Sequence, residues 1–418
     1  MPNAILANVM DNIKSKGGLE VGSEDDPFWF KVNGILKLDQ RFYISDKGKR
    51  SSKGTEPGTY HSGAQVRGSG LSLSGGIGKN WSYALGLGFD AAESKAEVED
   101  ASLTYKGFKQ LGDNFVISIG HINPGFCLEN TTSGTWHPFM EKSLTSSAFA
   151  PCPGLGVSMN THGDHFSITA AISQPPAADK VYDATKTEKK RSDRWNTSAR
   201  VTFAPIADTG KVLQLGVSGH FQDDAHAGIE FTTAPETKSR NTTTLLNTTV
   251  VNGDTNTRIA AKNHSTFDFE LTAQNGPFTG EVEYQFVNVN RGNNAQGISQ
   301  GDNLSFHGYH AQIAYVLTGE TRSFKKSSGT FGKIEPTADS GAWEVATRYS
   351  FINLNDKDIT GGTAHNTTIS LSWYANNNIR VIGEFVNSKQ QRLFSAPLAE
   401  TIDKRNLQSI GLRLQAVF

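Results

Sequence analysis

The sequence predicts an all-β protein, a 16-stranded antiparallel transmembrane β-barrel, and three observations carry this prediction. Segments that alternate apolar and polar residues recur along nearly the whole chain, and sixteen of them can be counted. Many are long, whereas strands of soluble sheets usually have about five or six residues. Short turns mostly alternate with long polar loops, as in outer-membrane barrels with one short-turn end and one long-loop end.

Composition supports the same class. Of 418 residues, 36% are hydrophobic and 19% are charged, with 42 glycines and 24 phenylalanines. Such a chain does not fit disorder, which needs high charge and few aromatics. It fits strands with a single apolar face. The net charge of −1 gives no overall field, so nucleic acid is not an expected partner.

The chain before the first predicted strand, residues 1–27, forms an N-terminal segment. Leu6, Val9, Met10 and Ile13 share one helical face, which predicts either a short helix that associates with its own copies or a frayed terminus. Residues 1–20 lack the charged start and long apolar core of a signal peptide. We therefore expect either a cytosolic chain or one numbered from a mature end.

The first strand sets the pattern for the rest. In FWFKVNGILKLDQRFY, Phe30, Leu36 and Leu38 share one face, and Lys37 and Asp39 share the other. The predicted strands span about 28–43, 64–74, 81–91, 97–106, 114–122, 154–160, 165–174, 194–204, 211–222, 265–275, 278–289, 304–318, 341–352, 366–376, 378–388 and 405–418.

A soluble β-sandwich is the alternative architecture, because it also uses strands with one apolar face. Aromatic residues near strand ends favour the barrel, since an interfacial girdle requires them. The weak point is the stretch 319–340, which is long but falls on the short-turn side by strand parity. A sandwich would suit a carbohydrate-binding protein or an enzyme. The acidic residues, however, are spread over many strands, so no catalytic site is expected.

Four runs resemble the phosphate-selective porin O/P family of bacterial outer membranes. SIGHINPGFCLENTTSGTWHPFMEKSL is similar to its strand followed by "G-x-x-x-P-x-x-LE-x-x-TS…FMER". GYHAQIAYVLTGETRSF and GAWEVATRYSFINLNDKDITGG are similar to "YxLTGExR" and "GAWExAxRYSxxxLND…GG". NTTISLSWYANNNIRV resembles the hairpin that follows. The resemblance implies a porin barrel over residues 28–418 in the bacterial outer membrane, with residues 1–27 in the periplasm, usually as a homotrimer passing small solutes.

The resemblance also implies that the third long loop, about 123–153, folds into the lumen and narrows the pore. Its charged and polar candidates for the constriction are Glu129, Thr135, Trp136, Glu141 and Lys142. A Cys127–Cys152 disulfide would fix both ends of the loop; the alternative is two separate thiols. Two cysteines offer no second pair of metal ligands, so neither a metal nor a cofactor is expected.

Strand parity identifies candidate pore-lining residues. The basic set is Lys31, Lys37, Arg41, Arg67, Arg200, Arg348, Arg380 and Arg413. The acidic set is Asp39, Asp268, Glu270, Glu281, Glu283, Glu344 and Glu384. Six of the basic residues, all but Arg200 and Arg348, lie on the first two and last two strands, which are neighbours in a closed barrel. Arginine suits phosphate because its planar fork binds two oxygens.

One departure from the family pattern bears on selectivity. Phosphate-specific members carry a lysine after "TSS" in the constriction loop, whereas this sequence reads TSGTW, with Thr135 at that position. The sequence therefore predicts a general porin for small hydrophilic solutes, with mild anion preference. A phosphate- or pyrophosphate-selective channel is the first alternative, and a soluble carbohydrate-binding sandwich the second. Reversing Arg41 or Arg413 to glutamate is expected to shift selectivity towards cations.

Overall fold

The structure is a computed structural model, and it describes residues 13–14, 18–22, 27–48, 60–90, 95–174, 181–182, 188–189, 194–224, 228–238, 244–248, 250–252, 255–292, 301–396 and 399–418. Leu6, Val9 and Met10 of the predicted N-terminal helix lie outside these residues. Ile13 belongs instead to a short strand, β1 (Ile13–Lys14), which pairs with β2 (Leu19–Val21). No helix in the described part of the chain is long and apolar enough to cross a membrane.

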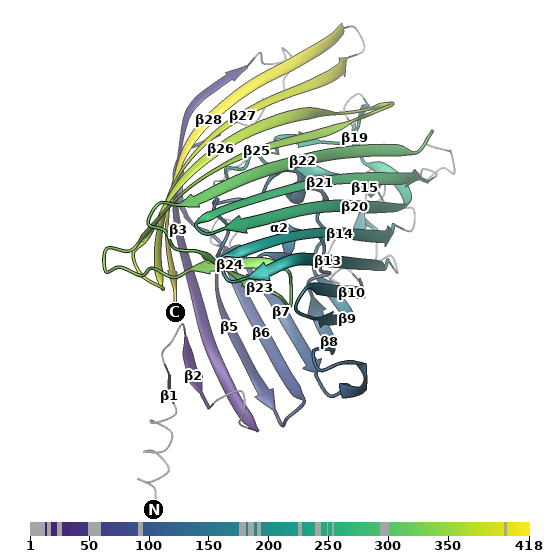
Figure 1. The fold of residues 1–418 in the computed structure, drawn as a ribbon. Helices are drawn as coiled ribbons and strands as arrows, with labels where there is room; N and C mark the ends of the chain where they lie inside the picture. Colours follow the sequence, from purple (N-terminus) through teal and green to yellow (C-terminus); the bar gives the residue numbers. More distant parts are fainter. Residues whose placement is uncertain are drawn as a thin grey trace, which may run out of the picture.

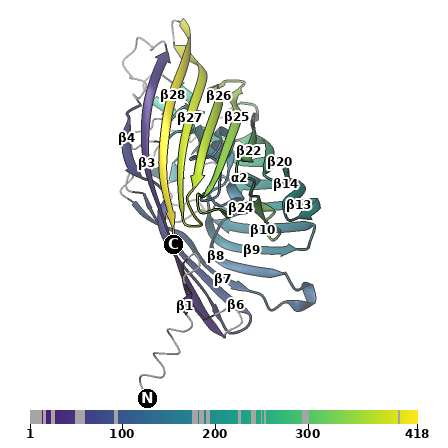
Figure 2. The same cartoon turned by 60° about the vertical axis from the view of Figure 1, so that its left-hand side comes forward.

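Sixteen antiparallel wall strands form a closed barrel, which confirms the predicted fold class (Figure 1). The last wall strand pairs with the first along most of its length, so the sheet has no free edge there (Figure 2). This closure overturns the β-sandwich alternative. The wall strands are β3 (Phe28–Gly48), β4 with β5 (Gly63–Val66 and Ser69–Ile77), β6 (Trp81–Asp90), β7 (Lys95–Tyr105), β8 (Val116–Ile122), β9 (Gly154–His162), β10 (Phe166–Gln174), β13 (Asn196–Asp208), β14 (Lys211–Asp223), β20 (Ile259–Asn275), β21 (Phe278–Arg291), β22 (Leu304–Val316), β25 (Ala342–Asp356), β26 (Ile359–Tyr374), β27 (Ile379–Ala396) and β28 (Ala399–Val417).

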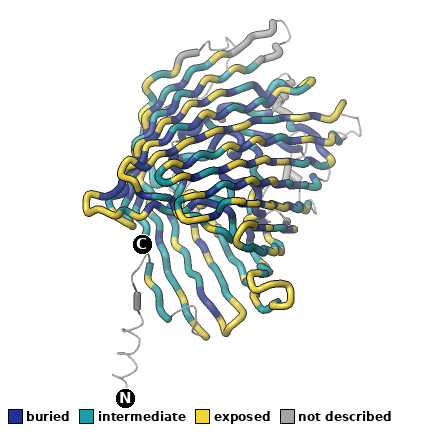
Figure 3. The backbone as a smooth tube through the Cα atoms, viewed as in Figure 1, coloured by how far each residue is buried: buried dark blue, intermediate teal, exposed yellow. Residues whose placement is uncertain are grey.

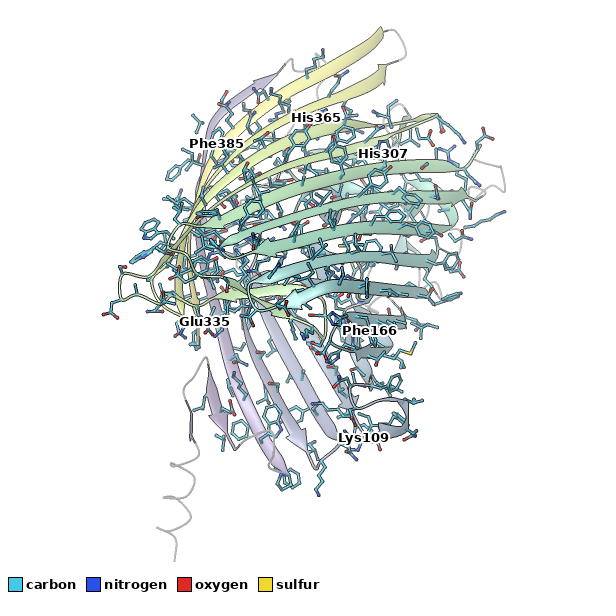
Figure 4. The ribbon with its side chains drawn as sticks, in the orientation of Figure 1. Lys109, Phe166, His307, Glu335, His365 and Phe385 are labelled. Atoms are coloured by element: carbon cyan, nitrogen blue, oxygen red, sulfur yellow. The ribbon has the colours of Figure 1, made fainter. Side chains whose placement is uncertain are left out.

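The two faces of the wall differ as the alternation predicts. On β14, Leu215 and Val217 are 52% and 49% exposed, while Gln214 and Ser218 on the other face are 1% and 5% exposed. Figure 3 shows buried and exposed positions succeeding one another along the strands. Phe385 projects away from the wall (Figure 4). An apolar outer face and a polar inner face are typical of a barrel surrounded by lipid.

Two β-bulges interrupt the wall. Leu38 pairs with Val66 and Ile35 with Gly70, so three residues of the second wall strand face two of β3. Gly68 provides the left-handed backbone that this bulge needs, with φ of 56°. On β7, Asp100 pairs with Gly86 and Val98 with Leu87, which leaves Glu99 as the extra residue. Bulges redirect side chains, and these two lie next to Arg67 and at Glu99.

Three connections pack against the inner face of the wall. The loop between β8 and β9 contains helices α2 (Leu128–Thr131) and α3 (Leu144–Phe149). The connection between β14 and β20 contains β15 (Gly228–Ile229), β16 (Thr232–Thr233), β17 (Leu246–Asn247), β18 (Val250–Asn252) and β19 (Thr255–Thr257). The long stretch on the short-turn side forms a hairpin of β23 (Arg322–Lys325) and β24 (Thr330–Ile334). Outside these three, the connections hold only β11 (Val181–Tyr182), β12 (Glu188–Lys189) and a 3-10 helix (Lys109–Leu111).

The largest apolar core lies inside the barrel rather than between two sheets. Its members come from α3, from the β14–β20 connection and from the long-loop ends of β20, β21, β22, β25 and β26: Leu144, Phe149, Ile229, Phe231, Leu245, Leu246, Ile259, Ala261, Val287, Val289, Leu304, Phe306, Ile352, Leu354, Ile359 and Ala364. At this level the inner face is apolar as well. The two loops therefore pack on the wall as a soluble core would, and this core fixes where their polar groups lie.

Candidate functional site

The β8–β9 loop contacts wall strands from widely separated parts of the barrel. Its Cys127 N–H donates to Ser218 of β14 at 3.0 Å, and its Met140 N–H donates to Glu384 of β27 at 2.8 Å. Its Thr135 carbonyl accepts from Gln415 of β28 at 3.2 Å. All three wall residues are on the polar inner face. The loop backbone is thus fixed to the wall on several sides.

Arg348 of β25 joins the wall to two loops. Its guanidinium lies 3.0 Å from Glu129 of the β8–β9 loop and 2.7 Å from Glu236 of the β14–β20 connection. It also donates to the Glu141 carbonyl at 3.0 Å and lies 4.5 Å from the ring centre of Phe139. All three ionic side chains are about 1% exposed. Charge-assisted bonds of this kind are strong and directional, so Arg348 positions both loops.

Three arginines of the predicted basic strip have the same role. Arg413 binds both oxygens of Asp39 at 2.7 Å and donates to the Met140 carbonyl at 2.8 Å. Arg41 lies 3.0 Å from Glu384, with both side chains fully buried. Arg380 donates to the His137 carbonyl at 2.8 Å and lies 3.7 Å from Glu344.

The β23–β24 hairpin is held by two further arginines. Arg322 pairs with Glu344 of β25 and donates to the Trp136 carbonyl of the β8–β9 loop at 2.8 Å. Arg200 of β13 pairs with Glu270 at 2.6 Å and donates to the Gly329 carbonyl at 3.2 Å. The hairpin therefore reaches from β25 to β13 at the short-turn end of the barrel.

The remaining predicted acids also have partners on the inner face. Glu283 accepts the Glu129 N–H at 2.6 Å, Glu281 accepts from Gln312 at 2.7 Å, and Asp268 accepts from Ser218 at 3.4 Å. These carboxylates are buried against the loop and its neighbours. They stabilise the packing of the loop rather than facing open space.

One large cavity of about 1140 Å³ remains beside the loop. It lies there because β5 and β6 present only small residues on their inner faces: Ser72, Ser74, Ser82, Ala84, Gly86 and Gly88. The cationic side chains that line it are Lys37, Arg67, Lys142, Lys238 and Arg413, and the carboxylates are Glu97, Glu99, Glu141 and Glu236. Thr135 and His137 also line it.

Few of the predicted pore-lining residues reach this cavity. Lys37, Arg67 and Arg413 do, together with loop residues Thr135, Glu141 and Lys142. Lys31 is on the same strand, opposite Ser74 and Glu20. The structure corrects the other assignments, because these side chains are buried in ion pairs or hydrogen bonds away from the cavity: Arg41, Arg200, Arg348, Arg380, Asp39, Asp268, Glu270, Glu281, Glu283, Glu344 and Glu384. Glu129 and the Trp136 carbonyl join these networks.

Sequence parity missed four lining residues. Glu97 and Glu99 fall in a strand that was predicted correctly, and the run EVED already carried the signal of two acids flanking one apolar residue. Glu236 and Lys238 belong to a loop without periodicity, so only the folded chain places them here.

The cavity carries fixed charges at neutral pH. Burial raises the pKa of the Glu141 carboxyl, but the guanidinium groups of Arg67 and Arg413 outweigh this effect and lower the pKa to about 2. Arg67 lies 3.2 Å from Glu141, and Arg413 lies 3.6 Å from it. Burial lowers the pKa of His137 to about 4, so this imidazole is neutral at pH 7.

The predicted disulfide is wrong. Cys127 is completely buried, and its sulfur caps α2 by accepting the Asn130 N–H at 3.4 Å, whereas Cys152 is exposed. The loop does not need the bridge because charged side chains of the wall hold it. Within the described residues, no group of three or more potential ligands forms a metal site.

Thiol labelling should distinguish the two cysteines. In the folded protein we expect a maleimide to react with Cys152 and to leave Cys127 intact, because burial shields the Cys127 thiol and raises its pKa well above the usual value. After denaturation both should react without prior reduction. The number of labels can be read by mass spectrometry. Zero labels before reduction and two after it would mean that the thiols are bridged after all.

A closed barrel with an apolar exterior, a charged lumen and a cavity beside an inner loop defines an outer-membrane porin. The chain matches the family model for phosphate-selective porin O and P over residues 36–418, and it belongs to that family. The family resemblance seen in the sequence is thereby confirmed, as is a location in the bacterial outer membrane.

Similar proteins agree with this assignment. Porin O of Pseudomonas aeruginosa is 27% identical over 416 residues, which cover 91% of this chain and 87% of that protein. Among solved structures, the outer-membrane protein OmpT of Vibrio cholerae has a TM-score of 0.55 at 11% identity, covering 94% of this chain and 99% of its own. The anion-selective porin of Comamonas acidovorans has a TM-score of 0.52 at 12% identity, covering 94% and 100%. The two structures share the fold.

Proposed function

We propose that this porin is a general diffusion channel for small hydrophilic solutes with a mild preference for anions, and that it catalyses no reaction. The observation that carries the proposal is the charge around the cavity, where five cationic side chains face four carboxylates. A small excess of one sign in a water-filled passage biases ion flow without excluding the other sign.

The β8–β9 loop forms the constriction in this proposal. Its contacts with β14, β27 and β28 support an inward position, and its residues Asn130 to Thr135 and Phe139 to Lys142 line one side of the cavity. Solutes would pass between this loop and the small side chains of β5 and β6. Lys142 faces this route while its ammonium donates to Asn130 at 2.6 Å.

A homotrimer in the outer membrane is the proposed assembly. Support comes from the solved trimer form of Vibrio cholerae OmpT, which has a TM-score of 0.54 at 10% identity. The apolar outer faces of the wall strands suit both lipid and neighbouring copies.

Selectivity for phosphate or pyrophosphate is the second candidate, and the family description favours it. Tight binding of a phosphate requires several cations that converge on one point. In this chain most inner arginines already bind carboxylates or loop carbonyls, and Thr135 offers no charge. These features favour the general channel.

Single-channel recording in a planar bilayer tests the proposal. In potassium chloride we expect a stable conductance, a small reversal potential of anionic sign, and little reduction of the current when phosphate is titrated in. Potent block by phosphate would instead support the phosphate-selective channel. A protein that inserts as folded trimers but conducts no ions would contradict both.

A further inference from the structure

The cavity holds a cation and a carboxylate at a defined spacing. We infer that it is a binding site for small zwitterions of the α-amino-acid type, which cross the channel in preference to longer zwitterions. This inference rests on the proposed channel function and names the solute class that the same passage favours. It depends on Lys37, Glu99 and two glycines between them.

The ammonium of Lys37 is fixed beside the first bulge. Its nitrogen donates to the Gly134 carbonyl of the β8–β9 loop at 3.2 Å. A Cβ atom built on Gly68 would lie 4.0 Å from the same nitrogen. An ammonium has three N–H donors, so the bond to Gly134 leaves donors for a solute. Arg67 lies in the same bulge, but Glu141 balances its charge.

The carboxylate of Glu99 lies over the neighbouring strand. A Cβ atom built on Gly88 of β6 would come within 2.4 Å of its Oε1 atom, so any larger residue there would displace it. Glu99 is exposed, and it is the extra residue of the second bulge. Glu97 pairs with Gly88 in the β-ladder and lines the same cavity.

The register of the sheet sets the distance between the two charges. Gly70 pairs with Gly88, and Gly68 precedes Gly70 by two residues. Two residues along a strand and one step across the sheet place Gly68 and Gly88 ~8 Å apart. The Lys37 ammonium and the Glu99 carboxylate, each next to one of these glycines, are therefore separated on this scale. The glycines leave the space between them open.

A ligand that bridges the two charges must have its own charges close together. Two charge-assisted hydrogen bonds of ~2.8 Å each take up most of the gap and leave ~2–3 Å between the ligand's ammonium and carboxylate atoms. This spacing matches an α-amino acid, in which both groups are attached to one carbon. In a γ-amino acid the two groups are further apart, and only one of them can be bound well. A dianion such as phosphate meets Glu97 and Glu99 as like charges.

Liposome swelling with two isomers tests the inference. The probes are α-aminobutyrate and γ-aminobutyrate, which have the same size and net charge, and ribose serves as the neutral reference in the same vesicles. In the wild type we expect α-aminobutyrate to cross several-fold faster than its isomer, relative to ribose. Glu99→Gln and Lys37→Met should each bring the ratio of the isomers close to one. Asp113→Asn, which neutralises an exposed carboxylate of a short turn, should keep the wild-type ratio.

The outcomes separate this inference from the channel function. Equal uptake of the two isomers by the wild type, with normal ribose uptake, would overturn the inference alone. An isomer preference that survives both Glu99→Gln and Lys37→Met would overturn the assigned site. Absence of ribose uptake by wild-type vesicles would overturn the general channel and the inference with it.

Discussion

Replacing Arg348 with alanine should open the passage and make its current noisy. The substitution removes the shared partner of Glu129 and Glu236 and leaves two buried carboxylates uncompensated. Removal of one member of a buried ion pair typically costs about 3–5 kcal/mol. The wall ladder remains intact, so the cost falls on the attachment of the two loops. We expect a higher mean single-channel conductance with frequent jumps between levels in a planar bilayer.

Arg291→Ala is the matched control for this experiment. Arg291 ends β21 and lies 2.8 Å from Asp358, whose side chain is 59% exposed, so its ion pair is of the weak surface type. We expect wild-type conductance and noise from it. If Arg348→Ala also conducts like the wild type, the two loops do not depend on Arg348 for their position.

Replacing Lys37 with glutamate should shift ion selectivity strongly towards cations. Lys37 lines the cavity, and its reversal changes the charge of the passage by two units next to Glu97 and Glu99. Fixed charges in a narrow wet passage set the local concentration of each ion. We expect a several-fold change in the permeability ratio, measured as the reversal potential in a potassium chloride gradient at low salt.

Lys31→Glu provides the comparison for Lys37→Glu, because it makes the same substitution on the same face of β3 at a position outside the cavity lining. We expect a much smaller shift of the reversal potential. Equal shifts for both variants would mean that the cavity is not the selective part of the pore. Arg41→Glu is no longer a selectivity test, since it would place two glutamates together in a fully buried site.

The strand pattern was predictable because it depends on local chemistry. Lipid requires an apolar outer face, and this requirement imposes a period of two on every wall strand. All sixteen predicted strands therefore exist, several with longer ends, such as β3, which continues to Gly48. The stretch 319–340 resisted prediction because no local rule shows that a short-turn connection folds back onto the inner face. Its Arg322 and Gly329 are held by residues far away in the sequence.

The sequence alone also identified the family, since ordered motifs are a property of the chain and not of its packing. It did not identify the cysteine arrangement. Two cysteines at the ends of one loop are compatible with a bridge, but the spatial separation of a buried and an exposed thiol arises only when the loop packs.

The sequence by itself determined the barrel, the two faces of each strand, the family and the outer-membrane location, because all of these follow from patterns along the chain. Only the tertiary structure decided which charges remain in the passage. Parity assigns a residue to the inner face but does not show what it meets there, and Arg348 meets a carboxylate 219 residues away. Closure of the barrel brings loops and arginines together, and burial favours pairing of their charges. Lys37 and Glu99 remain at the cavity because the small residues of β5 and β6 leave space beside them.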